Sequence, residues 1–300
     1  MKNKTRLSMI ISLVAAMFIL SMYSGVVAAQ TPDDIYKQNM EKYQNTKKKL
    51  DDTRELFDKA NSKLRNLNDV NSREELKIKT KDYLLSAIDH TRSHLEVLKT
   101  RVGQREDKSS IPNANAIIDA HLAELDQIKA DVEAAQTNQD FVAAHKKLKD
   151  LWEKIRLETR YYVGIILNQR IDNFITTTDD VRIRMDAAIT NMTAAGKNVS
   201  KLEADKASFN KLVTEAIANQ ARTEELYNEH SGFADDGTVI NATAARDFLK
   251  QFDASQRATI KSLKQASKEV LKFVKDYRQI SNGKLKIEGA ATSTLSGKRR

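Results

Sequence analysis

The sequence predicts an all-α protein, an elongated antiparallel helical bundle in which about six long helices form coiled-coil-like hairpins. Composition is the first observation: of 300 residues, 30% are charged and 40% hydrophobic, while nine are glycine and two are proline, which is typical of long helices. The second is periodicity, because apolar residues recur at spacings of three, four and seven along most of the chain. Third, no segment shows a convincing strand alternation.

The first helix is expected to start at Thr31-Pro32-Asp33-Asp34. An N-cap residue, a proline in the first turn and acidic groups near the positive end of the helix dipole all favour a start there. A strict spacing of seven then predicts a coiled-coil seam about 35 residues long, with the members Tyr36, Tyr43, Leu50, Phe57 and Leu64. We expect exposed members of this seam to support self-association.

The next three helices follow from the same kind of pattern. Ser72 and Glu75 form a capping box that opens a helix to about residue 102, and a third helix is expected over 114–135. The short segment 137–140 predicts a tight turn, so the third and fourth helices should form an antiparallel hairpin. The fourth helix should run to about residue 192, with a kink or break at its β-branched run 175–178.

Two more helices complete the predicted bundle. Gly196 stands where a helix C-cap is expected, and Ser200 with Glu203 opens a fifth helix. The glycine-bearing stretch 231–241 separates it from a last helix over about 242–280. The same order of helices and loops occurs before and after about residue 165, which predicts that the bundle over 30–283 has two halves meeting near 165–180.

The first 29 residues have the pattern of a secretory signal peptide. Three basic residues, Lys2, Lys4 and Arg6, precede an apolar stretch over 7–27, and small residues end at Ala29. We expect cleavage after Ala29 and an exported, extracytoplasmic protein, either secreted or at the cell surface. The alternative is an uncleaved membrane anchor, because the apolar stretch is long enough to span a bilayer.

Charge is concentrated at the two ends of the chain. Residues 30–283 hold 42 basic and 40 acidic side chains, whereas the tail 284–300 holds five basic and one acidic. A nearly neutral body argues against nucleic acid as a partner, because such binding needs clustered cations. The tail is expected to be disordered, and it offers an alternative function, an envelope-associated module that recognises anionic lipid or polysaccharide.

Histidines are the main candidates for chemistry. His90 and His94 stand four residues apart on one helix, a spacing that can hold a metal, but no third ligand is identifiable and solvated side chains are the simpler expectation. His121 and His145 lie on seams and are expected to be half-buried structural residues. With no cysteine in the chain, thiol nucleophiles and thiolate zinc sites are excluded.

Two further sets of residues are candidates for modification or binding. Three glycosylation sequons occur, at Asn191, Asn198 and Asn241. A segment that is apolar on all sides of its helix is either enclosed by neighbouring helices or exposed as a partner patch; its members are Tyr161, Tyr162, Val163, Ile165, Ile166 and Leu167.

Parts of the chain resemble a loose group of exported, all-helical proteins of archaea and some bacteria. The resemblance is carried by helix-packing patterns in 81–88 (KDYLLSAI), 141–156 (FVAAHKKLKDLWEKIR) and 185–202. It covers about residues 80–280. It implies an all-helical fold and export, and it supplies no catalytic residues.

These observations favour a non-catalytic structural or interaction protein, a spacer, scaffold or adhesin-like module at the cell envelope. No glycine-rich phosphate loop follows a strand, no nucleophile elbow is present, and no cofactor is expected. The expected partner is another protein or a second copy, bound through helix seams, with a membrane tether over 7–27 in the anchored alternative. A metal-binding protein is the least favoured alternative.

Overall fold

The structure is an all-α helical bundle, as the sequence predicts. The computed structural model describes residues 30–103 and 113–281, and within these ranges it contains six helices and no strand. The predicted signal peptide or anchor and the basic tail 284–300 lie outside the described residues. The chain divides into two compact units. The first unit contains 30–167 and Leu226–Phe252, and the second contains Asn168–Glu225 and 253–281.

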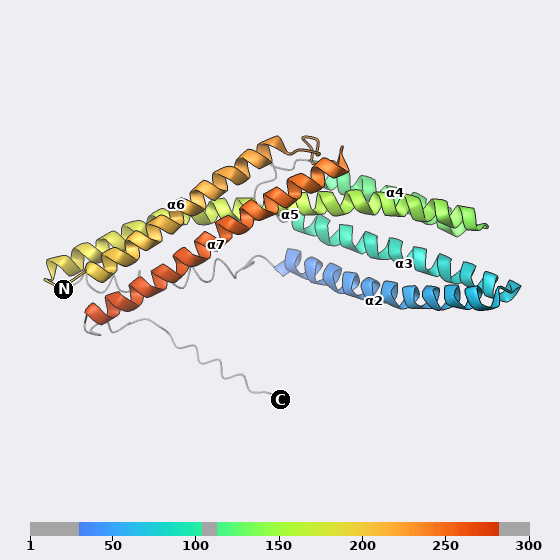
Figure 1. Ribbon diagram of the computed structural model, residues 1–300, viewed down its shortest axis with the longest axis horizontal. Coiled ribbons are helices and arrows are strands. Elements are labelled where there is room, and N and C mark those ends of the chain that lie inside the picture. The colour runs from blue at the N-terminus through green and yellow to red at the C-terminus, as the bar shows by residue number, and fades with distance from the viewer. Residues whose placement is uncertain (1–29, 104–112, 282–300) are drawn as a thin grey trace, which may run out of the picture. The chain divides into compact units, whose positions relative to one another are not determined.

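Four helices pack side by side in the first unit (Figure 1). They are α2 (Gln30–Leu67), α3 (Val70–Gly103), α4 (Ala114–Ala134) and the first part of α5 (Asn138–Ala194). Helices α2 and α3 are antiparallel, because Lys42 pairs with Glu96 whereas Lys49, later in α2, pairs with Asp89, earlier in α3. Helices α3 and α4 are antiparallel too, since Arg92 pairs with Asp126 and Lys99 pairs with Asp119.

Helix α3 begins earlier than the sequence pattern predicts. Its N-terminus is capped by Asp69, whose Oδ1 accepts the backbone N–H of Ser72 at 2.6 Å. This hydrogen bond lowers the pKa of the Asp69 carboxyl. The predicted capping box is therefore wrong, since Ser72 lies inside the helix with its hydroxyl buried and unpartnered.

Helix α5 is continuous over 57 residues, so the predicted kink or break near 175–178 is absent. The threonines of that run bond back to the helix itself, with Thr176, Thr177 and Thr178 donating to carbonyl oxygens three residues earlier at 2.6–2.7 Å. These bonds satisfy the hydroxyls without displacing the backbone ladder. The turn before α5 has the predicted tight form, with Asp140 accepting the N–H groups of Gln136 and Thr137.

Three helices form the second unit: the later part of α5, most of α6 (Ser200–Glu229) and the later part of α7 (Ala242–Ile280). Its apolar core includes Met185, Phe209 and Phe273. A polar layer lies in the same unit, where the Gln220 amide donates to Asn168 at 2.8 Å and Asp172 at 2.6 Å. Burial and the nearby Glu224 raise the pKa of the Asp172 carboxyl.

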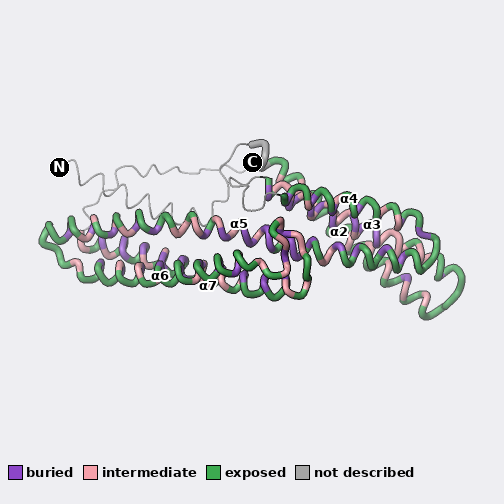
Figure 2. The backbone as a smooth tube through the Cα atoms, turned by 90° about the horizontal axis from the view of Figure 1, so that it is seen from above, coloured by how far each residue is buried: buried purple, intermediate pink, exposed green. Residues whose placement is uncertain are grey.

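Burial follows the helix faces that meet inside each unit (Figure 2). The core of the first unit is formed by buried side chains such as Ile88, Leu125 and Ile155. Helix α2 differs from its neighbours, because among its described side chains Ala60 alone is fully buried. Across 30–103 and 113–281, no helix is apolar over a length that would cross a bilayer.

Candidate functional site

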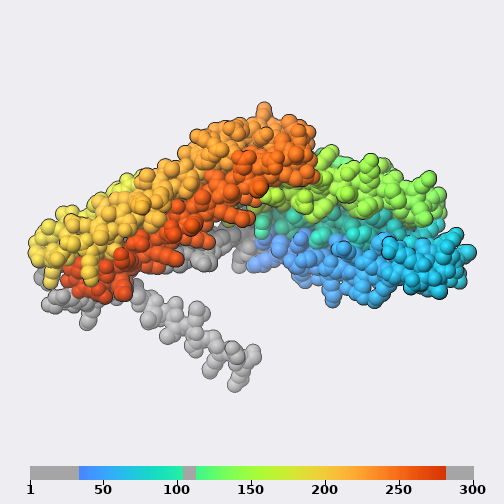
Figure 3. Space-filling view, in the orientation of Figure 1, coloured from blue at the N-terminus to red at the C-terminus, as the bar shows by residue number. Residues whose placement is uncertain are grey.

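The α2–α3 seam is the contact between α2 and α3, and its apolar layers come from the heptad residues of α2. Tyr36, Tyr43, Leu50, Phe57 and Leu64 face α3, and all five are half-buried. Phe57 stacks on Tyr83 with ring centroids 5.6 Å apart. Figure 3 shows the face of α2 turned to the viewer uncovered by the other described helices of the first unit. The predicted coiled-coil seam thus packs within the chain, and it is only partly shielded from solvent.

Polar layers alternate with these apolar layers. The Asn39 amide donates to the Thr100 hydroxyl at 2.9 Å, and the hydroxyls of Thr46 and Ser93 lie 2.7 Å apart. One heptad further, Thr53 of α2 is half-buried. Small hydroxyl and amide side chains bury little apolar surface, so they add less to the hydrophobic attachment of α2 than apolar side chains would. They disfavour shifts of fewer than seven residues, because such a shift would leave the paired groups without partners.

Sequence reasoning missed this polar repeat. A signal was present in the sequence, because a polar residue follows three successive apolar members of the seam by three positions: Asn39, Thr46 and Thr53. Ala60 continues the same spacing after Phe57. A search for apolar residues alone does not detect it.

Lysines and acids form a ladder along one edge of the seam. The three interhelical ion pairs are Lys42–Glu96 at 2.7 Å, Lys49–Asp89 at 3.2 Å and Lys63–Glu75 at 2.6 Å. The acidic positions of α3 recur every seven residues at 75, 82, 89 and 96. The facing positions of α2 form a lysine series with the same spacing, Lys42, Lys49 and Lys63, in which Leu56 takes the place of a fourth lysine. Exposed ion pairs of this kind stabilise weakly, but in coiled coils they set partner and orientation.

His90 and His94 lie in the seam among aromatic side chains. His90 stacks on Tyr43, with ring centroids 4.8 Å apart, and His94 meets the edge of Trp152 at 5.5 Å. The His94 Nε2 is also 3.2 Å from the Thr159 hydroxyl. These histidines are half-buried packing residues, which corrects the expectation of solvated side chains.

The surroundings of His90 and His94 favour the neutral form of each imidazole. Burial lowers the pKa of both His90 and His94, and positive charge nearby adds to this effect, from Lys47 on His90 and from Arg101 on His94. Across 30–103 and 113–281, no three His, Cys, Asp or Glu side chains converge as a metal site would require. The two histidines therefore have no third ligand among the described residues.

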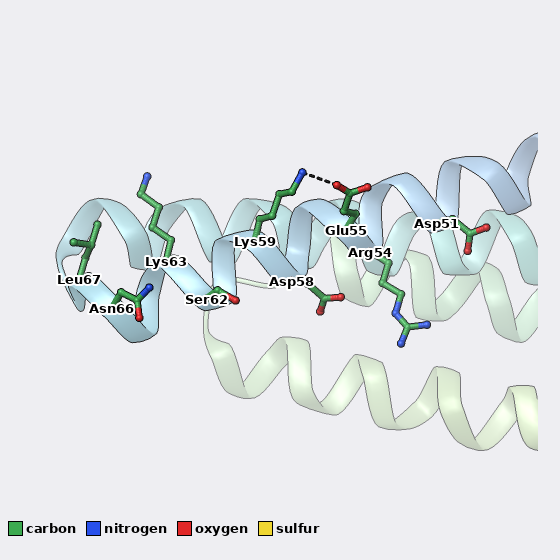
Figure 4. Close-up of a pocket in the computed structure, with 9 residues that line it drawn as sticks. All are labelled: Asp51, Arg54, Glu55, Asp58, Lys59, Ser62, Lys63, Asn66 and Leu67. Atoms are coloured by element: carbon green, nitrogen blue, oxygen red, sulfur yellow. Dashed lines mark ion pairs between the residues drawn. The ribbon is translucent and has the colours of Figure 1, made fainter.

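Two shallow grooves border α2. One, about 780 Å³ in volume, follows its outer face (Figure 4), where Glu55 pairs with Lys59 at 2.5 Å. The other, about 640 Å³, includes Thr46, Lys49, Asp89 and Arg92 beside the ion-pair ladder. Both are lined mainly by charged and polar side chains of mixed sign, which is the chemistry of a solvated helix surface.

A second polar cluster lies under the loop between α6 and α7. His121 of α4 and Glu158 of α5 are buried and paired at 2.5 Å, and the other Glu158 oxygen accepts the Val239 N–H at 3.1 Å. Beside them, Gly237 has φ +87° and packs against Tyr162. The Tyr162 hydroxyl is buried without a partner, and burial raises the pKa of this phenol above its ordinary value. This cluster fixes the loop to the helices.

The predicted partner patch is largely enclosed. Tyr161, Tyr162 and Ile165 are buried, and Tyr161 stacks on Phe233 of the loop with centroids 4.4 Å apart. The other three candidates, Val163, Ile166 and Leu167, are half-buried. The enclosed alternative therefore describes Tyr161, Tyr162 and Ile165, and Phe233 of the loop and Phe248 of α7 pack against Tyr161.

Other candidate residues lie apart from the seam. His121 is buried, but His145 is exposed, so the expectation of a half-buried His145 is wrong. The sequon residues Asn191, Asn198 and Asn241 are all exposed. Asn198 and Asn241 also use their side-chain oxygens as helix caps, accepting N–H groups of Ser200 and of Thr243 and Ala244 at 3.0–3.1 Å.

No protein-family model, curated protein or solved structure matches this chain. Function is therefore inferred from the α2–α3 seam and its surroundings.

Proposed function

We propose that the protein is a non-catalytic structural or interaction protein that acts outside the cytoplasm, as a helical spacer or scaffold at the cell envelope. Its interaction element is α2, which binds a protein partner or a second copy of the chain. The N-terminal pattern of residues 1–29 supports export.

The observation that carries this proposal is the incomplete cover of the heptad seam. A coiled-coil helix normally buries its apolar positions fully between partners, whereas Tyr36, Tyr43 and Leu50 remain half-buried against α3. Ile35 and Leu56, each one residue before a seam position, are 53% and 44% exposed. Together these side chains form an apolar flank that another helix would cover.

Location is tested by expressing the full chain and fractionating the cells. Intact mass and N-terminal sequencing should find the protein in the envelope or medium, beginning at Gln30 or retaining its anchor. A chain that stays in the cytoplasm and begins at Met1 would contradict the proposal.

The interaction is tested with a photo-crosslinking amino acid at Ile35 or Leu56. The matched control is Ile183 of α5, which is 65% exposed in the second unit. Crosslinks in intact cells should form from the two α2 positions and be weak or absent from Ile183. Equal yields from all three positions would show that α2 is no preferred binding element.

A further inference from the structure

Helix α7, orange to red in Figure 1, concentrates positive charge in the second unit. Its part of that unit, residues 253–280, holds seven basic and three acidic side chains, whereas α6 as a whole holds four basic and six acidic. The nearly neutral sum over 30–283 therefore conceals one helix with an excess of cations.

Six of these cations form one exposed line, which we call the basic stripe. Their positions alternate at spacings of four and three, and Leu271 stands in the series where one cation is missing. The stripe therefore lies on one face of the helix over about 32 Å, opposite the buried face that includes Ala266, Val270 and Phe273. Its members are Arg257, Lys261, Lys264, Lys268, Lys275 and Arg278, all of them exposed.

The acids of α7 do not neutralise this stripe. Two of them serve Lys272, which lies beside the stripe and pairs with the buried Asp205 at 2.7 Å. That hydrogen bond to Asp205 raises the pKa of Lys272, and Glu269 and Asp276 add to the effect. The third acid, Asp253, precedes the stripe. Within 30–103 and 113–281, no member of the basic stripe forms an ion pair.

Unpaired like charges at these spacings are unfavourable for the helix itself. Cations three or four residues apart on one helix face repel each other, and four neighbouring pairs of the stripe have this spacing: Arg257–Lys261, Lys261–Lys264, Lys264–Lys268 and Lys275–Arg278. The lysines of α2 differ, because acids of α3 pair with Lys42, Lys49 and Lys63. A line of cations without acids does not serve folding, and it attracts anionic ligands.

We propose that the basic stripe binds a linear acidic polysaccharide, whose chain lies along α7. A polymer with repeated negative groups matches a single line of cations, because it can follow the helix along its length. The choice of polysaccharide rests on the proposed location at the cell envelope. The stripe itself goes beyond the proposed interaction role of α2 and does not depend on it.

Two other classes of polyanion fit the stripe less well. Single-stranded nucleic acid is bound largely by stacking of bases on aromatic side chains, but the aromatic residues of α7 are buried. They are Phe248, Phe252, Phe273 and Tyr277. Membrane-surface helices place an apolar face in the bilayer beside their cations, whereas the apolar face of α7 is turned into the core and Leu271, 44% exposed, is the one apolar side chain in the series over 257–278.

The test measures binding of the purified full chain to polygalacturonate, an acidic polysaccharide, with neutral dextran as the blank. The variant Lys261→Gln/Lys264→Gln/Lys268→Gln removes the middle of the stripe and should weaken binding at least tenfold. Calorimetry at several salt concentrations gives Kd, whose dependence on salt should become shallower in the variant because fewer counterions are released. Circular dichroism checks that the fold is retained.

Two matched variants separate the stripe from net charge. Lys146→Gln/Lys149→Gln/Lys154→Gln removes the same number of charges from exposed positions of α5 in the first unit, and it should change Kd less than twofold. Lys261→Arg/Lys264→Arg/Lys268→Arg keeps the charges and should bind as the native protein does. Equal losses from the two glutamine variants would overturn the proposal, and so would the absence of binding to polygalacturonate.

Competing ligands decide the class of partner. Phosphatidylglycerol vesicles and double-stranded DNA are supplied at the same concentration of negative charge as polygalacturonate. Tighter binding of either one would overturn polysaccharide as the partner, and weaker binding of both would support it. A chain found only in the cytoplasm, or one without preferred photo-crosslinks from α2, would contradict the proposed function and leave the effect of the α7 variants on Kd unchanged, so the two proposals fail or hold separately.

Discussion

His121 on α4 and Glu158 on α5 form a buried pair, with 2.5 Å between Nε2 and Oε2. Glu158 also accepts the Val239 N–H, so one carboxylate joins two helices and the loop between α6 and α7. Glu158 is 1% exposed. A buried carboxylate is tolerated only where its oxygens are paired, and both oxygens of Glu158 have partners here.

Replacing Glu158 with alanine should destabilise the first unit by about 3–5 kcal/mol, because His121 and the Val239 N–H would lose their buried partner. Glu158→Gln should cost less, since an amide keeps one acceptor oxygen. Urea unfolding followed by circular dichroism measures both values. Limited proteolysis should detect faster cleavage within 230–241 in the alanine variant. An alanine variant as stable as the native protein would show that the pair does not anchor the loop.

Gly237→Ala should destabilise more than Gly196→Ala. Both glycines have positive φ, +87° and +69°, but a Cβ on Gly237 would lie 2.7 Å from a Tyr162 ring carbon, whereas a Cβ on Gly196 meets nothing within 4 Å. The backbone conformation alone costs about 1–2 kcal/mol in each case, and Gly237 adds the clash with Tyr162. Thermal unfolding of the two variants compares them, and equal losses would mean that the loop moves away from Tyr162 easily.

Acidification should weaken the α2–α3 seam. Burial lowers the pKa of His94 in the folded chain, while the unfolded chain keeps the ordinary pKa of about 6.5. Protons therefore bind the unfolded chain more readily, and the free energy of unfolding should fall as pH decreases below about 6.5 toward the lowered folded pKa. His90 contributes in the same direction.

The matched variant for this prediction is His94→Phe, which keeps an aromatic ring between Tyr43 and Trp152 but cannot titrate. Urea unfolding at pH 7.5 and pH 5.5 should show a smaller loss of stability on acidification in His94→Phe than in the native protein. Identical pH dependence would place the acid sensitivity elsewhere.

Leu56→Lys should stabilise the seam slightly, by about 0.2–1 kcal/mol at low salt. Leu56 is 44% exposed and occupies the lysine series of α2 at the level of Asp82, so a lysine there would extend the ion-pair ladder. Leu56→Gln is the uncharged control. Urea unfolding in 20 mM and 500 mM salt should show the gain only for lysine and only at low salt. A gain that persists at high salt would point to a cause other than charge.

The sequence predicted the helices well because their signals are local. The spacing of Tyr36, Tyr43 and Leu50 defines a helix face without reference to the rest of the chain. The pairing of His121 with Glu158 could not be predicted in this way, because it depends on how two helices are rotated against each other. Asp69 was missed as a cap since Ser72 and Glu75 form an equally good local pattern. His145 was expected on the buried face of α5, but Ala144 beside it takes the buried position and His145 is exposed.

The seven-residue ladder also has a mechanical consequence. If tension on the N-terminal end of α2 draws it along α3 by seven residues, about 10 Å, Lys49 comes opposite Glu96 and Lys63 opposite Asp82. Thr46 then faces Thr100, and Thr53 faces Ser93. Two of the three ion pairs are replaced by equivalent ones, with Leu56 opposite Asp89 where the third would be. A step of seven residues, with the helix ends beside the two-residue turn at Asn68 and Asp69 unwound, would therefore keep part of the contacts of the hairpin.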